Sequence, residues 1–262
     1  MKYYVVSDIH GYYDQLIRAL EAAGFFGETQ PCKLIVCGDL LDRGSQANEL
    51  IAFMLELLQK GQLIYVLGNH EDLLVQCLQE IARSGAYDIA QGCSHHYRNK
   101  TWDTLLQISA MSEVDACNHS ELLVRSVVQS AFYEKLLPAG VDYYETPHYI
   151  FTHGWIPCVT KGYWPNYRYA AHPNWREAGA EEWHRARWHN GMELACKHSI
   201  TEPGKTIVCG HYHTSYGHAC IAHTCGEWDA DADFSPFAAN GILAIDGCTA
   251  YSGRVNCVVI ED

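Results

Sequence analysis

The sequence predicts an α/β fold in which parallel strands alternate with helices. Short apolar runs indicate buried strands, runs with helical spacing follow them, and glycine and polar residues mark the strand ends. This strand and helix pair recurs three times in the first 85 residues. Because βαβ alternation favours parallel strands, we expect the polar strand ends to meet at one edge of the sheet, where α/β proteins bind ligands.

The first strand is expected over Lys2 to Ser7 and is followed by Asp8 and His10. If the chain stays extended there, both side chains point to the same side, because side chains alternate with a period of two. A helix follows over Asp14 to Ala23. The pair can therefore hold one metal ion, or it can be a helix cap beside a surface histidine.

The second strand is expected over Leu34 to Cys37, and a helix follows over Gln46 to Lys60. Between them lie Asp39, just past the strand end, and Asp42. By itself this stretch also fits a glycine-bounded turn whose aspartates cap the helix.

The third strand, Leu63 to Leu67, ends at Asn69 and His70, and another helix is expected from Asp72. Three consecutive strands therefore end in polar residues. Chance does not explain that repetition, so we favour a shared site over three unrelated turns.

The region from about 85 to 140 interrupts the alternation. Helical patterns over Trp102 to Ile108 and Leu122 to Leu137 predict a helical insert or cap. No run rich in Gly, Ser and Pro marks a linker there. We therefore expect residues 1–262 to form a single domain.

Two later strands end in histidines. A strand over His148 to Thr152 is followed by His153, and one over Thr206 to Cys209 is followed by His211 and His213. With a period of two, His211 and His213 could face the same side. The strand ends thus offer nitrogen and oxygen ligands of the kind that suits first-row divalent metals.

The end of the chain is predicted to form a β-hairpin. Its two apolar runs, Ile242 to Asp246 and Val255 to Ile260, are joined around Gly253.

The composition argues against nucleic-acid and membrane partners. Lys and Arg total 18 against 31 Asp and Glu, for a net charge of -13, so phosphate backbones and anionic lipids would be repelled. No run approaches the roughly 20 apolar residues of a membrane helix. The 12 cysteines are scattered and form no Cys-x-x-Cys pair. A soluble, cytoplasmic protein is expected.

Five motifs lie in order between residues 8 and 213. They are Asp8-Ile9-His10-Gly11, Gly38-Asp39-Leu40-Leu41-Asp42-Arg43-Gly44, Gly68-Asn69-His70-Glu71, His153-Gly154 and Gly210-His211. Together they resemble the calcineurin-like metallophosphoesterase superfamily. The Asp-Arg-Gly and Asn-His-Glu forms are similar to its phosphoprotein phosphatase branch, which contains Ser/Thr phosphatases and symmetrical diadenosine tetraphosphate hydrolases. The resemblance implies a mixed β-sheet sandwich flanked by helices, with a helical insert.

The resemblance also implies two divalent metal ions, manganese first, with iron or zinc accepted. Asp39 would bridge them, and His213 would complete one shell as in the Gly-His-x-His form of the wider superfamily. The full set of implied ligands is Asp8, His10, Asp39, Asn69, His153, His211 and His213.

By the same resemblance His70 would be the general acid, oriented by Asp42. An imidazolium paired with a carboxylate can give up a proton near neutral pH. A purely structural role for His70 is the alternative.

The phosphoryl group would be bound by Arg43, Asn69 and a further arginine. The planar fork of Arg43 suits phosphoryl oxygens and makes it part of the catalytic set, although a surface salt bridge is the alternative. Among Arg168, Arg185 and Arg187, we select Arg187 for the second arginine.

The expected activity is hydrolysis of phosphomonoesters by in-line attack of a hydroxide that bridges the metals. The first expectation is a Ser/Thr-type protein phosphatase acting on a phosphorylated protein or a small phosphoester. The alternatives are a symmetrical diadenosine tetraphosphate hydrolase and a catalytically silent module that binds phosphorylated partners. Aromatic residues between Trp155 and Trp188 could line a substrate cleft or pack as a loop core.

Overall fold

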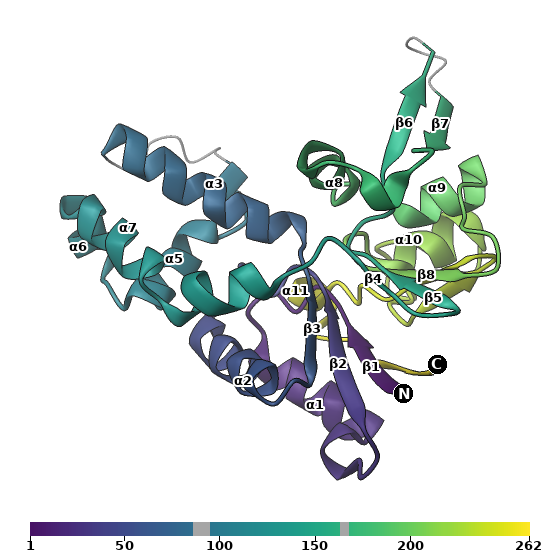
Figure 1. Ribbon diagram of the computed structural model, residues 1–262, viewed down its shortest axis with the longest axis horizontal. Coiled ribbons are helices and arrows are strands. Elements are labelled where there is room, and N and C mark those ends of the chain that lie inside the picture. The colour runs from purple at the N-terminus through teal and green to yellow at the C-terminus, as the bar shows by residue number, and fades with distance from the viewer. Residues whose placement is uncertain (86–94, 163–167) are drawn as a thin grey trace.

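Two mixed β-sheets pack face to face and carry helices on their outer sides (Figure 1). The structure is a computed structural model that describes residues 1–85, 95–162 and 168–262. The predicted mixed sheet sandwich flanked by helices is confirmed.

The first sheet contains the three parallel strands predicted from the first 66 residues, with the C-terminal strand antiparallel at one edge. In sheet order its strands are β11 (Val258–Glu261), β1 (Lys2–Val6), β2 (Cys32–Cys37) and β3 (Leu63–Val66). The helices that follow these three parallel strands are α1 (Tyr13–Ala23), α2 (Ala47–Gln59) and α3 (Asn69–Ser84).

The second sheet has β8 (Thr206–Cys209) at its centre, with the bounds predicted from the sequence. Its order is β4 (Tyr144–Glu145), β5 (Tyr149–Phe151), β8, β10 (Ile242–Ala244) and β9 (Phe237–Ala239). The predicted C-terminal hairpin is wrong, because β10 lies in this sheet and β11 in the other. The short helix α11 (Thr249–Ser252) lies between them.

Alternation of side chains explains why the first strands are apolar throughout. Tyr3 and Val5 pack between the two sheets, whereas Tyr4 and Val6 pack under the helices. Because both faces of β1 are buried, neither face can be polar.

The insert packs on the same core as the first sheet. Its helices are α4 (His95–Arg98), α5 (Thr101–Ser109), α6 (Glu113–Asn118) and α7 (Ser120–Val128). The helix predicted to reach Leu137 ends at Val128, and short helical turns follow at Phe132–Leu136 and Leu137–Ala139. Leu105 and Leu123 join the buried cluster that contains Leu16 and Leu50 of α1 and α2. The insert therefore shares a core with the helices of the first sheet, and the single domain stays a prediction.

The remaining elements belong to the second half of the chain. An antiparallel ribbon of β6 (Cys158–Lys161) and β7 (Arg168–Ala171) projects from it (Figure 1). The second sheet is covered by α8 (Ala180–Ala186) and α9 (Gly191–His198). Shorter turns are Phe25–Gly27, Trp175–Glu177, α10 (Thr214–Tyr216) and Gly217–Ile221.

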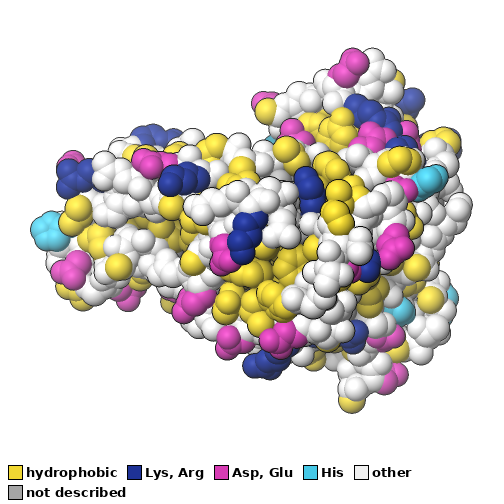
Figure 2. Space-filling view, turned by 60° about the horizontal axis from the view of Figure 1, so that its bottom comes forward, with side chains coloured by type: hydrophobic (Ala, Val, Ile, Leu, Met, Phe, Trp, Pro, Cys, Tyr) yellow, Lys and Arg dark blue, Asp and Glu magenta, His cyan; other side chains and the backbone are white. Residues whose placement is uncertain are grey.

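The surface matches the acidic composition. On the face in Figure 2 the Lys and Arg side chains are scattered among acidic and uncharged ones and form no continuous basic area. Among the described residues, no helix combines the length and apolar character that crossing a membrane requires.

Candidate metal centre and active site

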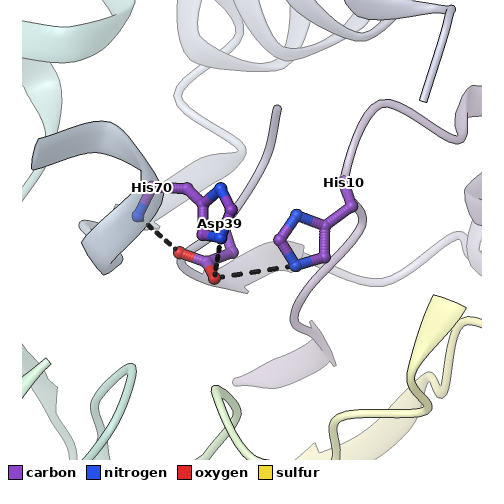
Figure 3. A group of neighbouring side chains, drawn as sticks. All are labelled: His10, Asp39 and His70. Carbon is purple, nitrogen blue, oxygen red and sulfur yellow. Dashed lines mark hydrogen bonds and ion pairs between the residues drawn. The ribbon is translucent and has the colours of Figure 1, made fainter. Parts of the chain in front are cut away.

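The polar strand ends of both sheets come together at one edge. Two groups of side chains there place their ligand atoms within 4.8 Å of one another. The first group is His10, Asp39 and His70 (Figure 3), and the second is Asp39, His153 and His211. Asp39 therefore belongs to both groups.

The carboxylate of Asp39 turns one oxygen toward each group. Its Oδ2 lies 3.7 Å from Nε2 of His10 and 3.8 Å from Nε2 of His70. Its Oδ1 lies 3.2 Å from Nε2 of His153. A carboxylate in this orientation can contact two cations at once, as a bridging ligand does.

His10 and Asp8 complete the first side of the centre. Nδ1 of His10 donates to the carbonyl of Leu41 at 3.1 Å, so its Nε2 is free to act as a ligand. That nitrogen lies 3.9 Å from Oδ1 of Asp8. Burial lowers the pKa of His10 well below its usual value, so the imidazole is neutral, as metal binding requires.

On the second side, Asn69 lies between two histidines. Its Oδ1 is 2.8 Å from Nε2 of His153 and 2.9 Å from Nδ1 of His211. Nδ1 of His153 donates to the carbonyl of Cys37 at 2.8 Å, which leaves Nε2 as the ligand atom. Burial lowers the pKa of His211 to about 3, so this ring is also neutral.

The donor set fits divalent cations. Nε2 of His153 faces two oxygens, from Asn69 and Asp39, and this arrangement favours a proton or a cation between them. Burial would lower the pKa of His153, but the Asp39 carboxylate raises it to about 10. A divalent ion would compete with that proton for the same lone pair, and mixed imidazole, amide and carboxylate ligands suit first-row metals.

Asp246 adds a carboxylate that the sequence pattern did not assign to the site. Burial, and then the neighbouring charge of Asp246, raise the pKa of Asp8 well above its usual value, and burial raises that of Asp246 to about 6. Buried carboxylates whose charges repel one another are stabilised by a cation. Asp246 ends a predicted strand, and the strand-end pattern used for Asp8 could have identified it.

His70 and Asp42 form the pair predicted from the sequence. Nδ1 of His70 lies 2.7 Å from Oδ2 of Asp42 and donates to it, while Nη2 of Arg43 donates to Nε2 of His70 at 3.3 Å. Burial would lower the pKa of His70, but Asp39 and Asp42 together raise it above its usual value. The geometry suits a proton donor held in place by Asp42.

Two threonines of the insert hold Asp42. Thr101 donates to Oδ2 at 2.7 Å and Thr104 to Oδ1 at 2.8 Å, and Thr104 also accepts from the backbone N–H of Asp42 at 3.1 Å. Both threonines are fully buried at the start of α5. The insert is therefore part of the active-site structure, which the sequence did not reveal.

Glu71 connects the chain segment after β2 to the segment after β3 through hydrogen bonds. Its carboxylate is buried and accepts backbone N–H groups of Gly68 at 2.6 Å, Leu40 at 3.0 Å and Asp39 at 3.1 Å. These bonds fix the start of α3, and so Asn69, relative to Asp39. A glutamate three residues after a helix cap is a recognisable signal for such a role.

The backbone of the site is strained. Of the eleven non-glycine residues with φ between 49° and 72° in the described part of the chain, six lie at the site: Asp8, His10, Asp39, Asp42, Arg43 and His211. Such conformations cost about 1–3 kcal/mol each and persist where the surrounding structure enforces them. Their concentration at one edge indicates that side-chain placement there outweighs local stability.

Gly68 and Gly210 permit close approach of the chain to the carboxylates. A Cβ atom at Gly68 would overlap Asp39, and one at Gly210 would overlap Asp8. Larger residues at these two positions would displace a candidate ligand.

The structure does not bring His213 into the metal groups. Its Nδ1 donates to Oγ of Ser215 at 2.8 Å, and its Nε2 lies 3.4 Å from Glu227. The expectation that His211 and His213 share a face fails because His211 has φ of 67°, so the chain is not extended there.

Arg187 is engaged by two carboxylates. Its Nη1 donates to both oxygens of Asp72, at 2.6 and 2.7 Å, and its Nη2 donates to Asp142 at 2.5 Å. The side chain is 9% exposed. This arrangement does not favour the predicted role as a phosphate ligand, because both ends of its fork are occupied.

The described part of the aromatic segment contains a packed core, and Tyr163, Trp164 and Tyr167 lie outside the described residues. Trp155, Trp175 and Trp183 are buried in one cluster beneath the second sheet. Trp188 differs, since it is 39% exposed and its ring lies 5.8 Å from that of His211. Of the two interpretations, loop packing holds for the three buried tryptophans.

Comparison with known proteins agrees with this geometry. A family model described as calcineurin-like phosphoesterase matches residues 1–215. An asymmetrical bis(5'-nucleosyl)-tetraphosphatase of Bacillus velezensis is 34% identical over 85 residues, 30% of this chain and 34% of the relative. A symmetrical bis(5'-nucleosyl)-tetraphosphatase of Actinobacillus succinogenes is 36% identical over 83 residues, 32% of this chain and 29% of the relative. The alignments thus span about a third of these curated relatives.

The fold is shared with a solved cold-active protein-tyrosine phosphatase of the psychrophile Shewanella. That structure has a TM-score of 0.53 and 16% identity, and the match covers 100% of this chain and 75% of the other. At this identity the likeness shows the fold alone.

Proposed function

Because the chain belongs to the calcineurin-like phosphoesterase family, whose members are metal-dependent hydrolases, we propose that it cleaves phosphoester or phosphoanhydride bonds at a two-metal centre. The proposed metal ligands are Asp8, His10, Asp39, Asn69, His153 and His211.

The observation that carries this proposal is the orientation of Asp39. One oxygen faces His10 and the other faces His153, as expected of a carboxylate between two cations. Two divalent ions would supply hydroxide from a water of lowered pKa and would neutralise charge on the phosphoryl oxygens.

Arg43 and His70 would act on opposite ends of the reacting bond. The partly exposed guanidinium of Arg43 can donate two hydrogen bonds to phosphoryl oxygens. When Arg43 turns to the substrate, Nε2 of His70 loses the donor it has in this structure and can carry the proton for the leaving group. Asp42 holds the ring through Nδ1 during that transfer.

For the substrate we propose a nucleoside polyphosphate. The support is the pair of relatives named bis(5'-nucleosyl)-tetraphosphatases, whose similarity covers about a third of this chain. The Ser/Thr-type phosphoprotein activity that the sequence placed first stays a prediction, as do manganese and a cytoplasmic location. A silent binding module is disfavoured, because two groups of side chains able to hold a metal ion share Asp39, and His70 pairs with Asp42.

The test compares diadenosine tetraphosphate with a phosphoserine peptide, with manganese added and with chelator. Chelator-sensitive formation of nucleotides at the higher kcat/KM supports the proposal. Release of phosphate from the peptide without cleavage of diadenosine tetraphosphate would overturn the proposed substrate. Activity on neither compound would overturn the proposal that the protein is an enzyme.

An Asp39→Asn variant tests the bridge. We expect loss of bound metal, measured by elemental analysis, together with loss of activity. Asp103→Asn, at an exposed position of α5, is the matched control. An Asp39→Asn protein that keeps two metals and full turnover would refute the assignment.

A further inference from the structure

Four aromatic side chains form a cluster next to the metal centre that neither the ligands nor the acid uses. We call His213, Trp228, Phe234 and Tyr251 the aromatic platform. The ring of Trp228 lies 4.3 Å from that of His213 and 5.3 Å from that of Tyr251, and Phe234 lies 5.6 Å from Tyr251. Trp228 is 49% exposed and Tyr251 is 61% exposed.

Hydrogen bonds of buried and partly buried groups hold the backbone around the platform in place. Asn256, which is 3% exposed, donates to the carbonyls of Phe234 at 2.8 Å and Ile245 at 3.2 Å. Ser215 accepts from His213 and donates to the carbonyl of Glu227, next to Trp228. Exposed rings on such fixed supports lose little freedom when a ligand binds.

The platform is connected to the metal centre at two points. His213 follows His211 by two residues, a span of at most about 7 Å between their Cα atoms. On the other side Thr249, in the same short helix as Tyr251, donates to the carbonyl of Asp8 at 2.8 Å. The platform is therefore joined to the chain segments that carry His211 and Asp8.

The charges around the platform favour a ring without phosphate. Glu227, Asp229, Asp231 and Asp233 lie in the loop that carries Trp228 and would repel an anionic group. Phosphates would instead be drawn to Arg43 and to divalent cations held by the proposed ligands. A ligand that matches both regions has phosphates at one end and an uncharged aromatic ring at the other, separated by a spacer.

A nucleotide has this form, with the ribose as the spacer. The ring of a phosphotyrosine is bonded directly through its oxygen to phosphorus and has no such spacer. Proteins that bind nucleobases without a preference for one base usually stack them on aromatic side chains.

We propose that Trp228 and Tyr251 form the surface on which a nucleobase of the substrate stacks. This inference rests on the proposed hydrolysis of nucleoside polyphosphates and assigns the residues that bind the nucleobase.

The test uses Trp228→Ala and Tyr251→Ala in the full chain, with Trp228→Phe as the conservative variant. Phe26→Ala, at a 52% exposed ring in the turn after α1, is the matched control. Loss of the stacking of one base corresponds to about a 5- to 150-fold loss of binding affinity. We expect kcat/KM for diadenosine tetraphosphate to fall by that factor more than kcat/KM for p-nitrophenyl phosphate, mainly through KM, with Trp228→Phe restoring most of the loss.

Calorimetric binding of AMP without added metal gives a readout independent of turnover. The alanine variants should bind AMP more weakly by a similar factor, and Phe26→Ala should not. Equal losses on both substrates with unchanged AMP binding would overturn the inference and leave the proposed function standing. If the wild type binds AMP but cleaves no nucleoside polyphosphate, and the alanine variants bind AMP more weakly, the proposed function fails and the platform stands. A loss confined to phosphopeptides would overturn the platform as a base site.

Discussion

Replacing Thr104 by valine tests whether the insert positions the catalytic histidine. The hydroxyl of Thr104 makes two bonds with Asp42, donating to its carboxylate and accepting from its backbone N–H. Thr101 makes one, to the carboxylate. Valine keeps the branched shape at either position and removes only the hydroxyl.

The expected loss of stability follows from these contacts. A hydrogen bond to a charged group contributes about 1.5–3 kcal/mol, and a buried N–H left without a partner costs about 1–3 kcal/mol more. Thr104→Val should therefore lower the free energy of unfolding by about 2.5–6 kcal/mol. Thr101→Val removes one donor and should lower it by about 1.5–3 kcal/mol. Thr160→Val, at an exposed position of β6, should stay within about 0.5 kcal/mol of the wild type.

Urea unfolding measures the first effect, as a shift of the midpoint at constant slope. Turnover measures a second effect, the loss of catalysis, because a less firmly held Asp42 should leave His70 poorly oriented. The loss of kcat should then be larger for phosphoserine or alkyl phosphates, whose leaving groups need a proton, than for p-nitrophenyl phosphate. A Thr104→Val variant as stable as the wild type, or a loss of kcat that does not depend on the leaving group, would refute the reasoning.

Other predictions concern the acid, a close contact and a surface ion pair. His70→Ala should reduce kcat most for substrates with poor leaving groups, and equal losses on p-nitrophenyl phosphate would exclude its role as general acid. Gly210→Ala should displace Asp8 and weaken metal binding, measured by elemental analysis, because its Cβ would overlap that carboxylate; normal metal content would contradict the close approach. A hydrogen bond from Arg176 lowers the pKa of Glu145 to about 2, so the stability this pair contributes is present above pH about 4.5 and is lost as the pH falls toward 2. Arg176→Gln should therefore cost about 0.5–1 kcal/mol more at pH 7 than near pH 2 in urea unfolding, and a loss that is the same at both pH values would show that the ion pair is not its cause.

The sequence alone determined the order of the main elements and most of the candidate centre. Each βα unit is encoded locally, by an apolar run and a helical pattern within about 25 residues, and parallel strands necessarily bring their carboxyl ends to one edge. For this reason Asp39, Asn69 and His153 could be assigned to one site from their positions at strand ends, and the structure brings them together.

Only the tertiary structure decided which neighbours these residues have. Thr104 reaches Asp42 from 62 residues away, and no local pattern encodes that contact. Arg187 is held by carboxylates from two other parts of the chain, so its position in the sequence could not reveal that its fork is occupied.

The position of His213 outside the metal groups has the same physical origin. A period of two applies only while the chain is extended, and the left-handed conformation of His211 turns the next side chains away. That conformation persists because the surrounding structure enforces it, through contacts such as the bond from its N–H to Asp8, 203 residues distant. Local patterns thus determined which residues are candidates for the metal centre, and long-range packing decided which of these candidates point into it.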